Sequence, residues 1–201
     1  MTELTLSRLR SETRILTREY YARPTIEVAK DLLGKVLVHG ETAGRIVEVE
    51  AYPGGDDLAS HSARGITDRT RVIFGPPGHA YVFFIYGMHE CFNVVAFGEG
   101  KGHAVLVRAG EPVLGIEHGV RASGPGLVCK ALGITRAKDG HDLTTPPLFL
   151  SARRGRPRIA TSARVGVAYA GEIAEAPWRF FEEGSPHVSR PNKKSIGLGR
   201  S

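Results

Sequence analysis

Hydrophobic and polar residues alternate along residues 45–52, the stretch that carries the most functional information. Successive side chains of an extended chain point to opposite faces at about 3.3 Å per residue, so this pattern predicts a strand with two distinct faces. The apolar face holds Val47, Val49 and Ala51, and the polar face holds Glu48, Glu50 and Tyr52. Pro53 and Gly54 end the strand. Taken alone, the pattern favours a polar face that meets water over a catalytic one.

The same reasoning predicts the other elements. A helix is expected over residues 24–34, capped by Thr25 and stopped by Gly34, and a second from Ser123 to Leu132, stopped by Gly133. Strands are expected at residues 35–39, 45–52, 81–86, 91–96, 104–109, 147–151, 163–169 and 178–181, and residues 56–70 read as a loop. Many short strands with few short helices predict an α+β fold around a mainly antiparallel sheet.

The composition suits a globular protein of 201 residues, 41% of them hydrophobic, which we read as one domain over residues 1–201. Residues 1–20 are expected to be a poorly ordered or helical extension, and residues 191–201 a flexible tail. The net charge of +6 suits an anionic partner such as nucleic acid or an acidic membrane surface. No stretch approaches the roughly 20 apolar residues of a membrane span, which favours a cytoplasmic protein without a membrane partner.

Several kinds of chemistry are disfavoured because their motifs are absent. The sequence has no glycine-rich phosphate loop after a strand, no G-x-S-x-G and no H-E-x-x-H, and its eight histidines are scattered. Cys91 and Cys129 lack a paired spacing, so neither a disulfide nor a structural zinc site is supported. We therefore expect no metal and no cofactor.

Tyr86 stands beside Gly87 at the tip of the hairpin predicted from residues 81–96. An exposed aromatic tip can act as a wedge between DNA bases, although a hairpin that folds back to cap the core is at least as common. A nucleotide extruded by such a wedge needs stacking walls, which Tyr52 and Phe83 offer, and Glu50 would prepare a water molecule for attack. His61 lies in a polar loop, where an ordinary surface histidine is the default interpretation and a site histidine near a carboxylate is the alternative.

Eight blocks then occur in order between about residues 21 and 190. They are LLGKVLV at 32–38, GRIVEVEAY at 44–52, ASHS at 59–62, YVFFIYGM at 81–88, CFN at 91–93, VLVRA at 105–109, SGP at 123–125 and ARVGV at 163–167. With these blocks in this order, the chain resembles the alkyladenine (3-methyladenine) DNA glycosylase family over most of its length. The resemblance implies a single α+β domain with a curved antiparallel sheet, short flanking helices and a protruding β-hairpin.

The resemblance also implies catalytic roles. Glu50, rather than Glu48, would be the general base that activates water, and Arg108 and the backbone carbonyl of Val165 would hold that water. Spacing alone leaves the choice between the two glutamates open. Tyr86 would fill the space left by the flipped nucleotide.

Further roles follow for the base pocket. Tyr52, His61 and Phe83 would stack on the base, and His61 would offer a backbone hydrogen bond to the base edge. Asn93 would disfavour normal guanine by crowding its exocyclic amino group. Contacts to the DNA backbone are expected from Arg64, Arg69, Arg71 and Met88. Phe83 departs from the family's tyrosine, and His89 and Glu90 replace residues that are usually apolar or aromatic.

The implied function is a monofunctional DNA glycosylase that flips alkylated or deaminated purines out of duplex DNA and leaves an abasic site, initiating base excision repair. Its substrates would be of the 3-methyladenine, 7-methylguanine, hypoxanthine and ethenoadenine class. We expect a monomer without a lyase step, associated with the nucleoid in a bacterium. Two alternatives stay open: a nucleic-acid-binding protein that is not an enzyme, and a sugar hydrolase that uses Glu48 and Glu50, roughly 7 Å apart, as a carboxylate pair.

Overall fold

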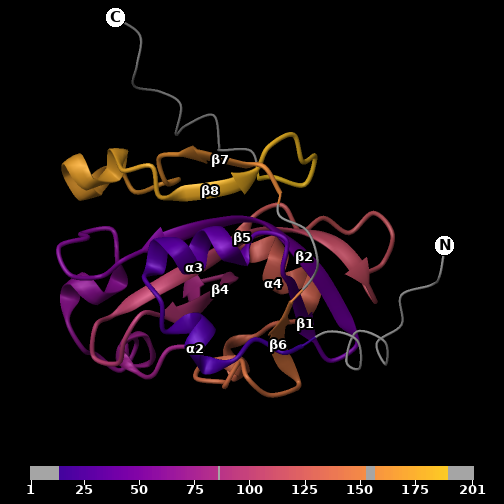
Figure 1. The fold of residues 1–201 in the computed structure, drawn as a ribbon, viewed down its shortest axis with the longest axis horizontal. Helices are drawn as coiled ribbons and strands as arrows, with labels where there is room; N and C mark the ends of the chain where they lie inside the picture. Colours follow the sequence, from indigo (N-terminus) through magenta and orange to yellow (C-terminus); the bar gives the residue numbers. More distant parts are fainter. Residues whose placement is uncertain (1–13, 86, 153–156, 190–201) are drawn as a thin grey trace, which may run out of the picture.

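The computed structural model describes residues 14–85, 87–152 and 157–189, and the structural statements below concern these residues (Figure 1). The expected tail at 191–201, the proposed wedge Tyr86 and residues 1–13 of the expected extension lie outside them. The described part of that extension contains a short helix, α2 (Arg18–Tyr21), whose Tyr21 is buried in the core. No helix in these ranges combines the length and the apolar character needed to cross a bilayer.

A curled antiparallel sheet organises the fold. Its strands are β1 (Val36–His39), β2 (Thr42–Tyr52), β3 (Ala80–Ile85), β4 (His89–Ala96), β5 (His103–Leu114), β6 (Leu148–Ser151), β7 (Ile159–Ser162) and β8 (Arg179–Glu182). The order of hydrogen-bonded strands is β3-β4-β5-β2-β1-β6, and the β7–β8 hairpin joins the sheet at β2. The predicted α+β class with its antiparallel sheet is thereby confirmed.

Strand β2 occupies the centre of this arrangement. One edge pairs with β5 along nearly its whole length, and the other edge pairs first with β1 and then, from Glu48 to Glu50, with β8. The register with β5 shifts on both sides of Glu48, and such bulges bend a strand and increase its twist. The bend lets the β7–β8 hairpin, orange and yellow at the top of Figure 1, reach the carboxylate-bearing part of β2.

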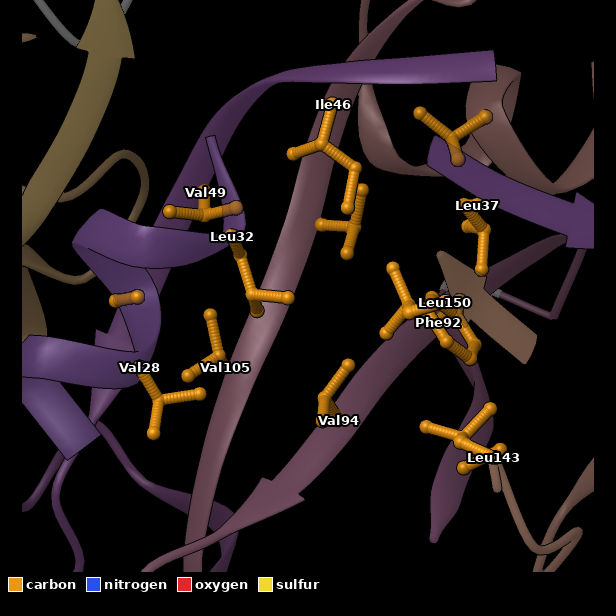
Figure 2. Close-up of a cluster of buried hydrophobic side chains, with 14 of the residues drawn as sticks. Val28, Leu32, Leu37, Ile46, Val49, Phe92, Val94, Val105, Leu143 and Leu150 are labelled. Carbon is orange, nitrogen blue, oxygen red and sulfur yellow. The ribbon is translucent and has the colours of Figure 1, made fainter. Parts of the chain in front are cut away.

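Two eight-residue helices, α3 (Thr25–Leu32) and α4 (Pro125–Leu132), complete the core. Helix α3 has Pro24 at the N-cap position expected for Thr25, and α4 ends at the left-handed Gly133 as predicted. The side chains labelled in Figure 2 are Val28, Leu32, Leu37, Ile46, Val49, Phe92, Val94, Val105, Leu143 and Leu150, and all are buried. Burial of one large aliphatic side chain contributes about 1.5–3 kcal/mol. This core fixes the sheet whose opposite face carries the polar residues.

Two expectations about the elements are wrong, and one strand was not predicted. Residues 163–169, expected as a strand, are a loop that leads into the 3₁₀ helix η4 (Ala168–Glu175), because Gly166 adopts a positive φ of 76° that breaks an extended run. The strand β7 was not expected at all. Strand β5 does not stop at residue 109: it continues to Leu114, and Pro112 is accommodated next to a register shift where the ladder is already irregular.

Short 3₁₀ helices interrupt the loops. They are η1 (His61–Arg64), η2 (Arg71–Phe74) and η3 (Arg136–Lys138). The first lies inside the segment expected as a plain loop. Ser60 caps it, since its hydroxyl accepts the amide N–H of Ser62, and this turn sets the position of His61.

Candidate active site

Because side chains alternate along each strand, one face of the sheet packs into the core and the opposite face lines a cavity. Residues of the central strands that belong to the core are Ile46, Val49, Ala51, Ala80, Val82, Phe92, Val94, Val105 and Val107. Residues between them line the cavity: Tyr81, Phe83, Ile85, Cys91, Asn93, Ala104, Leu106 and Arg108. The polar face of β2 does not meet water, because Glu48 and Glu50 are both 0% exposed. The solvent-facing reading of that face is therefore wrong.

The cavity has a volume of about 170 Å³. Its lining includes four residues predicted for a base pocket and two predicted to act beside Glu50, namely Tyr52, His61, Phe83, Asn93, Arg108 and Val165. Strands β2 to β5, the η1 turn and the loop after β7 supply them, so residues separated by more than 100 positions meet in one place.

Glu50 lies directly behind this lining and is bonded to three of its residues. Tyr52 donates its hydroxyl to Oε2 at 2.9 Å, and the amide N–H of Val165 donates to Oε1 at 2.8 Å. The Arg108 guanidinium nitrogen Nη1 lies 3.4 Å from the same Oε1. The carboxylate is thus held in one orientation from three sides.

Glu48 is bound very differently. Its Oε1 accepts hydrogen bonds from Nε of Arg108 at 3.0 Å, from Nε of Arg179 at 2.7 Å and from the hydroxyl of Ser189 at 2.8 Å. Its Oε2 accepts the amide N–H of Ser189 at 2.6 Å. Four donors therefore surround Glu48, and its place is that of an anchor between β2, β5, β8 and the end of the described chain.

The protonation of the neighbours supports donation toward Glu50. Burial, with a further contribution from Glu50, raises the pKa of the Tyr52 phenol well above its ordinary value, so Tyr52 keeps its proton. Burial alone would lower the pKa of Arg108, but Glu50 and Glu48 outweigh it and the pKa is raised. Arg108 therefore stays a cation between the two carboxylates.

Three rings form one wall of the cavity. The ring centroids of His61 and Phe83 are 4.4 Å apart, and those of Tyr81 and Phe83 are 5.2 Å apart. The Tyr81 hydroxyl and Nδ1 of His61 lie 2.9 Å apart, which fixes the orientation of the imidazole. Burial, followed by the charges of Arg69 and Arg64, lowers the pKa of His61 to about 4. The imidazole is therefore neutral near pH 7, and the reading of His61 as an ordinary surface residue is wrong.

Asn93 and Cys91 are neighbours on the cavity side of β4. The amide Nδ2 of Asn93 donates to the carbonyl oxygen of Tyr81 at 3.1 Å, which fixes the Asn93 amide at the cavity wall. Burial raises the pKa of the Cys91 thiol to about 11, so this thiol stays protonated. Cys91 and Cys129 are free thiols. Across the described ranges, no group of three His, Cys, Asp or Glu side chains is arranged to hold a metal ion.

The residues predicted to contact the DNA backbone are all exposed, and one of them, Arg69, also lines the cavity. Arg69 is exposed, packs its guanidinium 5.3 Å from the Phe83 centroid and lines the cavity. Arg71 is exposed and paired with Asp68, and Arg64 is exposed at the end of η1. Met88 is 71% exposed beside the hairpin tip.

Several residues of the site were not predicted. Tyr81 shares a strand face with Phe83, so alternation alone could have found it. Tyr169 lines the cavity with 72% of its surface exposed, and Asp57 and Arg164 form a buried pair behind Tyr52. The local sequence does not identify Tyr169, Asp57 or Arg164 as site residues, because their segments have the pattern of a polar loop and of a strand.

The α+β domain therefore holds an oriented carboxylate behind an aromatic cavity on one face of its sheet. This arrangement suits an enzyme whose substrate contains a flat ring that stacks on aromatic side chains. The model of the family described as "Methylpurine-DNA glycosylase" matches residues 19–186 of this chain. The chain belongs to this family.

Three relatives illustrate the similarity. Proteins of Myxococcus xanthus and Anaeromyxobacter sp. are 52% and 55% identical to this chain; each comparison covers 87% of it, and 93% and 92% of the relative. A protein of Methanocella arvoryzae is 48% identical to this chain, over 88% of this chain and 96% of the relative. All three are provisionally named 3-methyladenine DNA glycosylases.

Proposed function

We propose that this protein is a monofunctional DNA glycosylase that removes damaged purines from double-stranded DNA. The observation that carries the proposal is the position of Glu50, whose three bonded neighbours, Tyr52, Arg108 and Val165, all line the aromatic cavity. Membership of the methylpurine-DNA glycosylase family supplies the reaction, and the names of the relatives supply 3-methyladenine as a substrate.

The cavity suits a flat base that carries positive charge. The rings of Tyr52, His61 and Phe83 offer stacking faces, and electron-rich ring faces attract cations. Because the low pKa of His61 leaves its imidazole uncharged, that ring adds no repulsion toward a methylated, cationic purine. The backbone of His61 would bind the base edge, and Asn93 would crowd the exocyclic amino group of normal guanine.

The chemistry requires one base and no cofactor. Glu50 accepts a proton from a water molecule held by Arg108 and the Val165 carbonyl, and the water oxygen forms a bond to C1′ of the sugar. In a methylated purine that carries positive charge, the C1′–N9 bond breaks and its electron pair neutralises the charge of the leaving base. The same carboxylate stabilises the cationic character of the sugar in the transition state; proton transfer of this kind typically accelerates a reaction by about 10²- to 10⁴-fold.

The DNA must be opened before this step. Tyr86 would fill the gap left by the flipped nucleotide, and Arg64, Arg69, Arg71 and Met88 would contact the backbone around it. Exposure of these four residues supports the assignment. Phosphate contacts position a protein on duplex DNA and make binding sensitive to salt.

The two alternatives are weaker. A paired-carboxylate sugar hydrolase needs Glu48 as a second reactive group, but four donors from Arg108, Arg179 and Ser189 occupy its oxygens. A protein that only binds nucleic acid has no use for a buried carboxylate behind a cavity, since burial of a charge is costly unless it is paired.

The finer expectations are part of the proposal. Substrates would include 7-methylguanine, hypoxanthine and ethenoadenine besides 3-methyladenine, and the products would be a free base and an abasic site without strand cleavage. The protein would act as a single-domain monomer on chromosomal DNA in the cytoplasm.

A panel of duplexes, each with one lesion, tests this proposal. Base release and strand cleavage are measured separately, the latter before and after hot alkali. We expect base release from 3-methyladenine and related purines, with breaks only after alkali. Breaks before alkali would contradict the monofunctional assignment, and no release from any duplex would contradict the glycosylase itself.

A further inference from the structure

Arg164 and Asp57 form a buried ion pair that lies just outside the cavity. Nη1 of Arg164 donates to Oδ2 of Asp57 at 2.6 Å, and Nη2 donates to Oδ1 at 2.8 Å. Their side chains are 0% and 1% exposed. Neither residue is part of the cavity lining, so the pair is not placed to touch a base bound there.

The Arg164 guanidinium supports Tyr52. It packs 4.6 Å from the centroid of the Tyr52 ring and 4.9 Å from that of Trp178. Nη1 also donates to the carbonyl oxygen of Ala51, the residue before Tyr52, at 3.1 Å. Planar stacking and a two-pronged bond to a carboxylate together fix a guanidinium in one orientation. Tyr52 therefore has a rigid support behind it.

The same arginine fixes the chain at Val165. Because Val165 follows Arg164 directly, the anchored arginine limits where the Val165 amide can lie, and that amide N–H donates to Glu50 at 2.8 Å. Two of the three groups bonded to Glu50, the Tyr52 hydroxyl and the Val165 amide, thus depend on one side chain.

Asp57 extends the support to a third segment. Its Oδ1 accepts the amide N–H of Ala59 at 3.1 Å, and its carbonyl oxygen accepts the amide of Ser60 at 2.8 Å. These bonds set the turn that leads directly into His61. The pair therefore joins the end of β2, the turn before His61 and the loop that holds Val165.

We infer that Arg164 and Asp57 are positioning residues for base release: they hold Tyr52 and the Val165 amide on Glu50, and they orient the carboxylate toward the sugar. This inference rests on the proposed glycosylase function. Errors of about 1 Å in the placement of reacting groups can lower a rate by about 10²-fold. Loss of the fork-shaped guanidinium should therefore reduce the chemical step far more than it reduces DNA affinity.

The test compares Arg164→Lys with the wild type in single-turnover base release from a lesion that the wild type excises. Arg45→Lys is the matched control, because Arg45 also lies between acidic partners, Glu111 at 2.5 Å and Glu182 at 2.7 Å, at the far end of β2. Affinity is measured for a duplex with a stable abasic-site analogue, and melting temperature for each protein. Asp57→Asn, which keeps the size of the side chain and an acceptor oxygen for Arg164, is the second variant, and its melting temperature shows whether it folds.

We expect Arg164→Lys to release base about 10²-fold more slowly with an affinity within threefold of wild type, and Asp57→Asn to show a smaller loss of the same kind. Arg45→Lys should keep the wild-type rate. A rate within threefold of wild type in the Arg164 and Asp57 variants would overturn the inference alone, as would an equal loss in Arg45→Lys at equal melting temperature. No base release by the wild type would instead overturn the proposed function, and the inference with it.

Discussion

Glu48 and Glu50 are bound to the same arginine through different nitrogens. Nε of Arg108 donates to Oε1 of Glu48 at 3.0 Å, and Nη1 lies 3.4 Å from Oε1 of Glu50. Glu48 thereby fixes the guanidinium that faces Glu50. Two carboxylates on one strand face thus differ in their surroundings: Glu48 holds the arginine, and Glu50 is held by three residues of the cavity lining.

This relationship predicts the effect of Glu48→Gln. The change leaves Arg108 and Arg179 without their shared anion, and breaking a buried ion pair typically costs about 3–5 kcal/mol. We expect a loss of that order in the free energy of unfolding, together with slower base release. Urea unfolding measures the first effect. The exposed Glu41→Gln is the control and should stay within about 0.5 kcal/mol of wild type; a similarly small change in Glu48→Gln would contradict the anchoring role.

A second prediction concerns stability against pH. The pKa of His61 is lowered to about 4 in the folded protein, below its ordinary value of 6.5. Between these values the unfolded chain binds a proton at His61 that the folded chain does not, so stability rises with pH across this window and is lost as the pH falls from 6.5 toward 4. His61→Gln removes this proton. The difference in unfolding free energy between pH 6.5 and 4.5 should be smaller in the variant, and equal differences in both proteins would exclude a buried neutral His61.

Asn93 gives a prediction about selectivity. Its side-chain amide donates a hydrogen bond to the Tyr81 carbonyl at the cavity wall. Truncation to serine therefore opens space for the exocyclic amino group of guanine. We expect Asn93→Ser to raise release of undamaged guanine relative to hypoxanthine by roughly tenfold. Release from both duplexes by the same variant is the measurement, with hypoxanthine as the internal control. An unchanged ratio would show that Asn93 does not select the base.

The proposed wedge is tested by Tyr86→Ser. A small polar side chain cannot fill the gap in the base stack, so lesion-containing duplex should bind more weakly while undamaged duplex binds as before. Competition binding with the two duplexes measures this. If both affinities stay at their wild-type values, Tyr86 is not the wedge.

Much of the site could be predicted from local pattern. The alternation in residues 45–52 separates Glu48, Glu50 and Tyr52 from the core, and the same alternation places Phe83, Asn93 and Arg108 on the cavity side of their strands. A period of two residues needs no tertiary information, so it assigns the strand faces, whereas the choice of Asn93 and Arg108 as site residues came from the family resemblance.

The burial of those polar residues could not be predicted in this way. Glu48 is satisfied by Arg179 and Ser189, which lie 131 and 141 positions away, and Val165 reaches Glu50 across 115 positions. A local pattern cannot distinguish a carboxylate paired over such separations from one in water. The loop around Arg164 was missed for a related reason: its apolar alternation resembles a strand, while the inward-turned arginine and Gly166 make it a loop.

The central claim is that Glu50 activates the attacking water. Glu50→Gln keeps the size of the side chain and the acceptor for Tyr52 but removes the base. In single-turnover assays on a lesion duplex, we predict that base release falls by about 10²- to 10⁴-fold while affinity for that duplex stays within threefold. Base release at the wild-type rate in Glu50→Gln would contradict the account.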